Sequence, residues 1–310
     1  MITRFSIDLK EQKIYANGHE LASVMGLDKD GNGNRIYDYP DGRELFVATI
    51  KNPVLVTDIF KIGKFKPTVR DTLVKLLESS VKVTEYNGVK LSFEQGRYKG
   101  VWGPNIDTLL FCRALNKLDP ELFNGKSVIE IGPGSGFISK YILERFSGIN
   151  VITLVDLNPN AIQSSKDNIK DQRAKFVCGD AIKYIQGKKF DVLVCNPPYI
   201  PRQGSIDDNP YEGTGLINYL IAHSKEILNP GGVIITNLSS LSSKDVQRAV
   251  KDVGAREIKL DQMTVPLKVC NVLNNKEWMR YLLKCGLKKK YKNGYEYYQT
   301  ISISEIIPWF

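Results

Sequence analysis

The tetrapeptide Asn196-Pro197-Pro198-Tyr199 combines residue types that suit chemistry on a planar nitrogen. Two consecutive prolines remove two backbone N–H donors and stiffen the turn, so oxygen acceptors and an aromatic ring remain. The Asn196 side chain and the Pro197 carbonyl can each accept one N–H of an –NH₂ group, while the Tyr199 ring packs on the π-system. Holding both hydrogens orients the nitrogen lone pair, which matters for a poorly nucleophilic amide. We predict Asn196, Pro197 and Tyr199 as catalytic, and Pro198 and Tyr199 as substrate-binding, without a general base.

A glycine-rich run, Glu130-Ile131-Gly132-Pro133-Gly134-Ser135-Gly136, separates an apolar stretch from a helical pattern. Glycines let the chain turn tightly and bring backbone N–H groups against a ligand. Strand, glycine loop and helix occur in the order that a Rossmann-like cofactor site requires. The G-x-G-x-G spacing and the preceding acid are similar to those of S-adenosylmethionine (SAM)-binding methyltransferases, whereas NAD sites carry G-x-G-x-x-G.

Two further predicted strands end in acidic residues. Asp156 lies 20 residues after Gly136 and is followed by Leu157, and Asp180-Ala181 follows the next strand. An acid at the second strand tip can accept hydrogen bonds from ribose hydroxyls, and one at the third can hold an exocyclic amine of adenine. The resemblance implies that Glu130 and the glycine loop lie near the methionine part of SAM. The predicted cofactor-binding residues are Glu130, Gly132, Gly134, Gly136, Asp156, Leu157, Asp180, Ala181 and Asn196, with S-adenosylhomocysteine as product.

Alternating strands and helices must position these residues. Continuous apolar strands separated by helices predict a parallel sheet buried on both faces, hence an α/β fold. The predicted strands are Val128–Ile131, Val151–Val155, Lys175–Val177, Val192–Cys195 and Val233–Thr236, and the helices between them are Phe137–Phe146, Asn160–Gln172, Ala181–Ile185 and Leu216–Leu228. The fold class is therefore a Rossmann-like SAM methyltransferase sheet with a smaller, mixed α/β N-terminal domain.

The flanking regions give weaker patterns. We predict helices over Thr68–Ser79, Ile106–Lys117, Ser243–Val253 and Glu277–Lys284, a hairpin of Val81–Tyr86 and Val89–Phe93 around Asn87-Gly88, and late strands over Arg256–Val269 and Tyr295–Ser302. The predicted domains are an accessory or substrate-recognition domain (1–80), a hairpin and hinge (81–104), and a methyltransferase domain (105–310) with an insertion at about 268–294. Asp28–Arg35 reads as a polar turn, because Tyr39 stands where a calcium loop needs a glutamate.

Residues from about 84 to 240 resemble the PrmC/HemK family, which methylates a glutamine side-chain amide in translation release factors. Four stretches carry the resemblance: Tyr86–Phe93, Gly103-Pro104-Asn105-Ile106-Asp107-Thr108, Ile200-Pro201 after the tetrapeptide, and Tyr211–Leu216 with Leu228–Gly232. The resemblance implies an N-methyltransferase whose substrate-binding residues include Pro104, Asp107 and Thr108, and a release factor as protein partner. Trp102 lies in the hinge just before this segment, and we predict that it also lines the acceptor pocket.

The chain departs from that family where the substrate is chosen. Thr214 replaces the usual acid, Trp102-Gly103 replaces a Pro-Arg pair, and residues 1–70 do not resemble the family's helical bundle. A nucleic-acid base, adenine N6 or guanine N2, is therefore the alternative acceptor, because the tetrapeptide also suits a flipped-out base. A SAM-binding regulatory subunit without turnover is a third reading, against which the intact Asn196 and Tyr199 argue.

Composition excludes several other classes. The chain has only two histidines, His19 and His223, which argues against a histidine metal site or catalytic triad, so we expect no metal. The five cysteines form no C-x-x-C pair and no apolar run reaches membrane-spanning length, so we expect a cytoplasmic protein without membrane contact. The net charge is +9, and the lysines from Lys284 to Lys292 form a basic segment that could meet nucleic acid or simply be a solvated turn.

Overall fold

The computed structural model describes residues 81–94, 97–202, 213–267, 276–292 and 295–310, together with seven short strands between residues 5 and 56. Those strands are β1 (Phe5–Asp8), β2 (Lys13–Ala16), β3 (His19–Ser23), β4 (Gly26–Lys29), β5 (Arg35–Tyr37), β6 (Leu45–Ala48) and β7 (Pro53–Val56). They pair as antiparallel neighbours along the chain, β1-β2-β3, β4-β5 and β6-β7. The helix predicted over Thr68–Ser79 lies outside the described residues.

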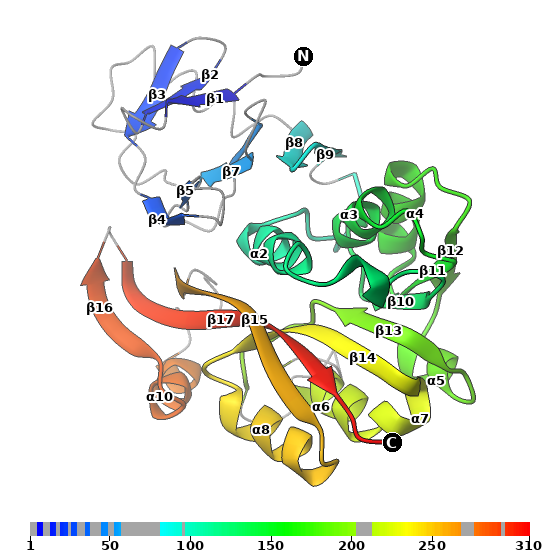
Figure 1. The fold of residues 1–310 in the computed structure, drawn as a ribbon. Helices are drawn as coiled ribbons and strands as arrows, with labels where there is room; N and C mark the ends of the chain where they lie inside the picture. Colours follow the sequence, from blue (N-terminus) through cyan, green and yellow to red (C-terminus); the bar gives the residue numbers. More distant parts are fainter. Residues whose placement is uncertain are drawn as a thin grey trace.

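An eight-stranded sheet organises the rest of the chain (Figure 1). Its order is β12-β11-β10-β13-β14-β17-β15, and β16 also pairs with β17. The strands are β10 (Ser127–Ile131), β11 (Val151–Asp156), β12 (Ala174–Cys178), β13 (Phe190–Cys195), β14 (Leu228–Ser239), β15 (Arg256–Pro266), β16 (Lys288–Lys292) and β17 (Tyr295–Ile307). The first five are parallel, as predicted, whereas β15, β16 and β17 pair antiparallel.

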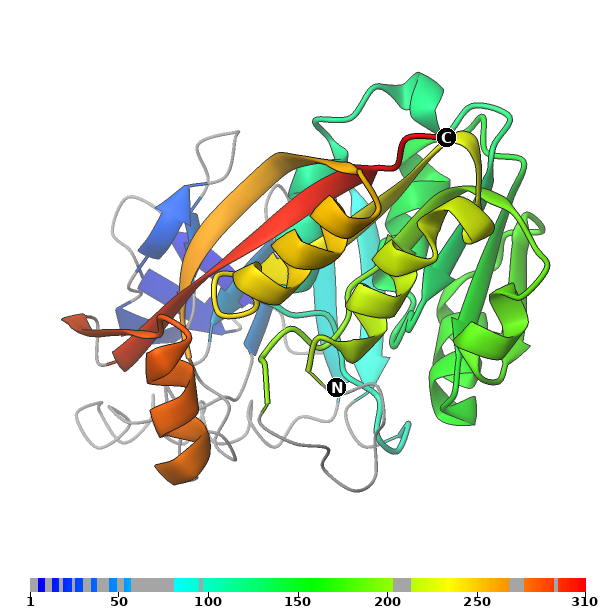
Figure 2. The ribbon, with the colours of Figure 1, turned by 90° about the horizontal axis from the view of Figure 1, so that it is seen from below.

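Helices cover both faces of this sheet (Figures 1 and 2). Side chains along β10 alternate between two cores: Val128 packs with α2, α3 and α4, and Ile129 packs with α6 and α8. The helices are α2 (Ile106–Leu115), α3 (Phe137–Arg145), α4 (Pro159–Asn168), α5 (Ala181–Ile185), α6 (Gly215–Ala222), α7 (Ser224–Ile227), α8 (Ser243–Asp252) and α10 (Lys276–Lys284), with a 3₁₀ turn at Pro120–Leu122. The hairpin of β8 (Val81–Tyr86) and β9 (Val89–Glu94) is as predicted.

β14 and β17 are longer than the strands predicted over Val233–Thr236 and Tyr295–Ser302, and two further predicted elements differ from the structure. The single helix expected over Leu216–Leu228 is divided into α6 and α7 at His223, whose ψ of 14° departs from helical values. The lysine cluster does not form a turn: Lys288–Lys292 is strand β16, in which Lys288 pairs with Tyr298 and Lys289 with Tyr297. Pairing with the long strand β17 overrides the low strand propensity of lysine.

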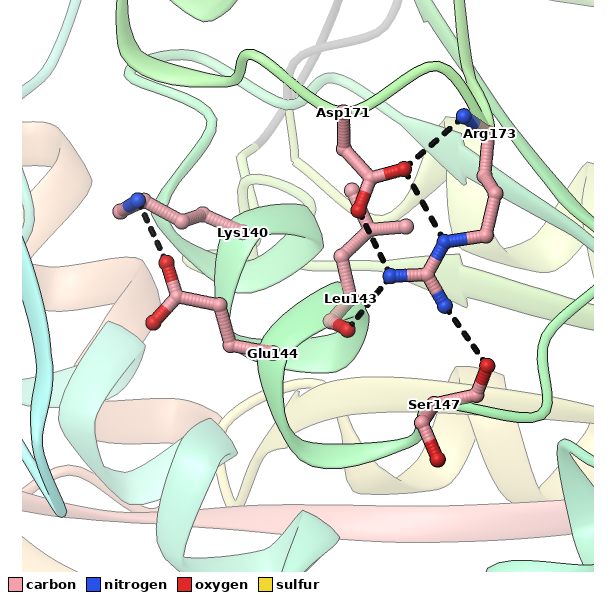
Figure 3. A network of polar contacts seen from close by, with 6 residues as sticks. All are labelled: Lys140, Leu143, Glu144, Ser147, Asp171 and Arg173. Carbon is pink, nitrogen blue, oxygen red and sulfur yellow. Dashed lines mark hydrogen bonds and ion pairs between the residues drawn. The ribbon is translucent and has the colours of Figure 1, made fainter.

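One arginine ties the helix layer to the sheet (Figure 3). Arg173 precedes β12, and its guanidinium donates to both carboxylate oxygens of Asp171, at 3.0 and 2.6 Å. The same group donates to the backbone oxygens of Leu143 and Ser147, both at 2.9 Å, at the C-terminal end of α3. These carbonyls have no partner within the helix, so a fixed cation satisfies them and complements the helix dipole.

We expect Arg173→Met to lower the free energy of unfolding by about 1–3 kcal/mol, because charge-assisted hydrogen bonds to two helix-end carbonyls are lost. Urea denaturation followed by circular dichroism measures the change. Lys140→Met is the matched control, since the Lys140–Glu144 pair shown in the same figure is an i,i+4 surface pair worth less than about 0.5 kcal/mol. Equal losses in the two variants would contradict the role given to Arg173.

Candidate active site

The predicted cofactor and catalytic residues meet at one edge of the sheet. In the strand register, Ile131 of β10 pairs with Val155 of β11 on one side and with Cys195 of β13 on the other. Asp156 pairs with Cys178 at the end of β12. The four strands therefore end level with one another, and open α/β sheets bind ligands at this carboxyl edge.

The glycine loop has the backbone geometry that its sequence predicts. Gly132, Gly134 and Gly136 all have positive φ, at 70°, 54° and 81°, which side chains other than glycine rarely adopt. A Cβ on Gly136 would lie 3.1 Å from the Ser165 Cα, so this glycine lets α3 approach α4. A Cβ on Gly132 would meet nothing within 4 Å, which leaves room beside the loop for a ligand.

Glu130 is a buried carboxyl group just before this loop. The Ser139 hydroxyl of α3 donates to it, and no ion pair involving Glu130 occurs among the described residues. Burial raises the pKa of Glu130 to about 7, against the opposing effect of the Ser139 hydrogen bonds. A buried carboxylate without a basic partner fits the ammonium group of a bound methionine moiety.

The two other acids take part in local turns. Asp156 accepts a hydrogen bond from the Asn158 N–H at 2.9 Å, and burial raises the pKa of its carboxyl. Asp180 is the N-cap of α5 and accepts from the Ile182 N–H at 2.9 Å. Leu157 is 53% exposed, although it is a large apolar side chain beside Asp156, and the half-buried Ala181 opens α5. An exposed leucine next to an acid suits a nucleoside, which has an apolar base face and a polar ribose.

Asn196, at the tip of β13, is held on both sides of its carboxamide. Its Nδ2 donates to the Asp107 carboxylate at 3.3 Å, and its Oδ1 accepts from Asn237 Nδ2 at 3.0 Å. The acceptor-only carboxylate on one side and the donor on the other fix which end of the amide is oxygen. Asp107 is itself buried, and burial raises the pKa of its carboxyl.

The remaining tetrapeptide residues differ in exposure. Pro197 is buried, Pro198 is exposed, and the half-buried Tyr199 packs against the core shared with α2 and α3. One part of the Tyr199 side chain is therefore packed against the protein core. The tetrapeptide Asn196–Tyr199 forms a corner directly after Cys195, whose neighbours in β10 and β14 are Ile131 and Thr236.

The predicted substrate-binding residues fall into two groups. Trp102 is 78% exposed, and its backbone oxygen would lie 3.4 Å from a Cβ on Gly134, so this segment passes beside the glycine loop. Pro104, Asp107 and Thr108 are buried. The Thr108 hydroxyl accepts from the Asn105 N–H at 3.2 Å within a capping box, so its evident task is to start α2 and thereby place Asp107.

Sequence reasoning missed two residues of this region. Asn237 closely follows the apolar run Val233–Ile235 of β14, and a buried amide at that place needs a polar partner. Trp278 of α10 donates its Nε1–H to the Pro201 carbonyl at 2.8 Å, a contact for which the local sequence gives no signal. Among the described residues there is no cluster of three metal-ligating side chains, and no helix long and apolar enough to cross a bilayer.

The substitution Glu130→Gln should raise the stability of the free protein and lower its affinity for the cofactor product. Because burial raises the Glu130 pKa above 4.5, ionisation destabilises the free protein as the pH rises from about 4.5 to about 7. Glutamine removes this effect, so the variant should be more stable than wild type at pH 8, by up to about 3 kcal/mol, and equal to it below pH 4. Calorimetry with S-adenosylhomocysteine should show at least tenfold weaker binding, since the ammonium loses its counter-charge.

Asp191→Asn is the matched control. Asp191 lies near the N-terminal end of β13, away from the candidate site. Burial raises the pKa of its carboxyl, but hydrogen bonds from Ser127 and Asn229 lower that pKa below its usual value. Its ionised form therefore stabilises the fold above the unfolded pKa, and the control should be less stable at pH 8 with unchanged ligand affinity. Unchanged affinity in Glu130→Gln as well would remove Glu130 from the cofactor site.

Comparison with known proteins agrees with this geometry. Residues 105–254 match the family model described as Methyltransferase small domain. A Methanocaldococcus jannaschii protein provisionally named a protein N5-glutamine methyltransferase is 29% identical over 204 residues, which cover 62% of this chain and 98% of that protein. A release factor glutamine methyltransferase of Clostridium acetobutylicum is 31% identical over 177 residues, covering 50% of this chain and 61% of that one.

A solved structure of a provisionally named transferase from Pyrococcus horikoshii aligns with a TM-score of 0.50 at 13% identity, over 87% of this chain and 92% of that one. At that identity the likeness concerns the fold alone, and it confirms the predicted Rossmann-like α/β class. Residues 105–254 therefore form a SAM-dependent methyltransferase domain, and the chain resembles the PrmC/HemK family.

Proposed function

We propose that this methyltransferase acts on the side-chain amide nitrogen of a glutamine in a protein. The observation that carries the proposal is the Asn196 carboxamide, held between Asp107 and Asn237 beside two prolines. Both relatives described above are named for glutamine methylation. The chain spans nearly all of the first relative but about three-fifths of the second, so the acceptor protein is part of the proposal.

The residues at the carboxyl edge of the sheet would bind either the cofactor or the acceptor amide. Glu130, the glycine loop, Asp156, Leu157, Asp180 and Ala181 would hold SAM, which supplies an electrophilic methyl group when bound. Asn196 Oδ1 has one lone pair engaged by Asn237 and keeps a second for an N–H of the acceptor amide. The Pro197 carbonyl would accept the other N–H, and the Tyr199 ring would lie against the amide plane.

This arrangement addresses the low reactivity of an amide nitrogen. Two fixed acceptors orient the lone pair, and their dipoles are most favourable when the nitrogen becomes positively charged in the transition state. Since Asp107 and Asn237 hold Asn196 before the acceptor arrives, little reorganisation is needed. The methylated nitrogen is then strongly acidic and loses its proton to water, so no side-chain base is required.

The parts outside the catalytic edge would select the acceptor. We assign residues 1–80 to an accessory or substrate-recognition domain, residues 81–104 to a hairpin and hinge, and residues 105–310 to the methyltransferase domain. The exposed Trp102, beside the glycine loop, would contact the acceptor loop. Exposed aromatic side chains are typical anchors of protein–protein contacts.

A nucleic-acid base is the second candidate acceptor, and one observation favours it. The lysines Lys284, Lys288, Lys289 and Lys290 of α10 and β16 are all exposed. Such a surface would attract phosphates, with an affinity that falls steeply as salt rises.

An acceptor assay separates the two candidates. The enzyme is incubated with labelled SAM and either a release factor with a Gly-Gly-Gln loop or bulk RNA, and mass spectrometry locates the added methyl group. We expect the label on glutamine in the protein. Label on adenine or guanine, together with RNA binding that weakens with salt, would replace the protein acceptor by a base.

Asn196→Ala should lower kcat by about 100-fold or more, because a preorganised acceptor for the developing charge is lost. Affinity for S-adenosylhomocysteine, measured by calorimetry, should stay within about threefold of wild type. Asn116→Ala, at the C-cap of α2, is the control asparagine and should leave kcat unchanged. Full turnover by the Asn196 variant would refute the role proposed for this residue.

A further inference from the structure

The segment formed by α10 and β16, residues 276–292, projects beyond the catalytic edge; we call it the appendage. β14 pairs with β17 residues 301–306, and β16 pairs with β17 residues 295–298. Tyr298 of β17 pairs with Lys288 of β16 and, on its other side, with Pro266 of β15. β16 thus continues the line of β14 past its C-terminal end, on the side where β13 presents Asn196 (Figure 1).

The appendage contacts the residues that directly follow the tetrapeptide. Trp278 of α10 donates its Nε1–H to the Pro201 carbonyl at 2.8 Å. The Arg202 guanidinium carbon lies 4.5 Å from the centre of the Trp278 ring, within cation–π range. Ile200 packs against the appendage core of Met279, Leu282 and Leu287.

The sequence of this segment explains why it needs an outside donor. Pro197, Pro198 and Pro201 have no N–H, so the segment cannot be fixed by a regular hydrogen-bond ladder. Pro201 is buried, and a buried carbonyl without a donor is unfavourable by about 1–3 kcal/mol. The indole N–H of Trp278 satisfies that carbonyl and ties the end of the proline-rich corner to α10.

We infer that Trp278 is a positioning residue, through which the appendage sets the geometry of the Asn196–Tyr199 corner. The inference rests on the proposed function of that corner. Trp278 acts through the Pro201 backbone, two residues after Tyr199, and does not itself meet the acceptor. The appendage thereby belongs to the acceptor side of the active site, and the cofactor side does not depend on it.

Trp278→Phe tests the inference because phenylalanine keeps a ring next to Arg202 and removes the donor. We expect kcat to fall about tenfold, the equivalent of one hydrogen bond, while affinity for S-adenosylhomocysteine stays within twofold. Native-state hydrogen exchange should become faster at the residues of segment 199–202 that carry a backbone N–H, which are Tyr199, Ile200 and Arg202. Trp309→Phe is the matched control, since Trp309 is 68% exposed, and it should change neither measurement.

Leu282→Val separates positioning from general stability. Leu282 is fully buried in the same appendage core, and the change removes a methylene without removing the Trp278–Pro201 bond. This variant should be less stable yet keep wild-type kcat and wild-type exchange at residues 199–202. Equal loss of kcat in both variants, or unchanged exchange in Trp278→Phe, would overturn the inference.

The readouts also keep the two proposals apart. If wild-type enzyme does not methylate glutamine, the proposed function fails, and kcat is then measured on whichever acceptor the wild type methylates. Hydrogen exchange needs no acceptor, so faster exchange at residues 199–202 in Trp278→Phe still supports the positioning contact, and its absence still overturns it.

Discussion

A neutral side-chain amide held from two sides at a strand tip is the contact on which the candidate active site of this methyltransferase depends. Asn196 Nδ2 faces the Asp107 carboxylate, and Asn196 Oδ1 faces Asn237 Nδ2. Three elements supply these groups: the first turn of α2, the end of β13 and the interior of β14. An amide rotated by half a turn would place its oxygen against a carboxylate, so the network selects one orientation. The fold around the network can be understood as the means of bringing these elements together.

The parallel strands of the sheet bring these elements together. Ile131, Val155 and Cys195 are neighbours in register, so β10, β11 and β13 end at one level and their loops open on the same side. The capping box of α2 fixes where the helix starts, which fixes Asp107. On the far side, the proline-rich segment after Tyr199 leaves the sheet without N–H donors of its own, and α10 supplies one. The glycine loop therefore supports the proposed cofactor side of the site, and the appendage supports the proposed acceptor side.

Much of this could be predicted from local sequence. Strand tips bearing Glu130, Asp156 and Asn196 follow from apolar runs and the rule that parallel strands share a carboxyl edge. Contacts between distant residues could not: Asp107 and Asn196 are 89 positions apart, and Trp278 and Pro201 are 77 apart. The lysine-rich strand β16 could not be predicted either, because its conformation is set by pairing with β17 and opposes the low strand propensity of lysine. Asn237 was visible as a polar residue close after the apolar run Val233–Ile235, but its partner was not.

The last strand of the sheet in sequence is not an edge strand. β17 lies between β14 and β15, and it also pairs with β16. β14 ends 56 positions and β15 ends 29 positions before β17 begins, and the two have no direct pairing with each other. During synthesis, this half of the sheet cannot close until residues 295–307 have left the ribosome, and until then both neighbours present open strand edges. The protein is therefore expected to acquire its acceptor side last, and chaperones would find their most exposed substrate in the nascent chain at that stage.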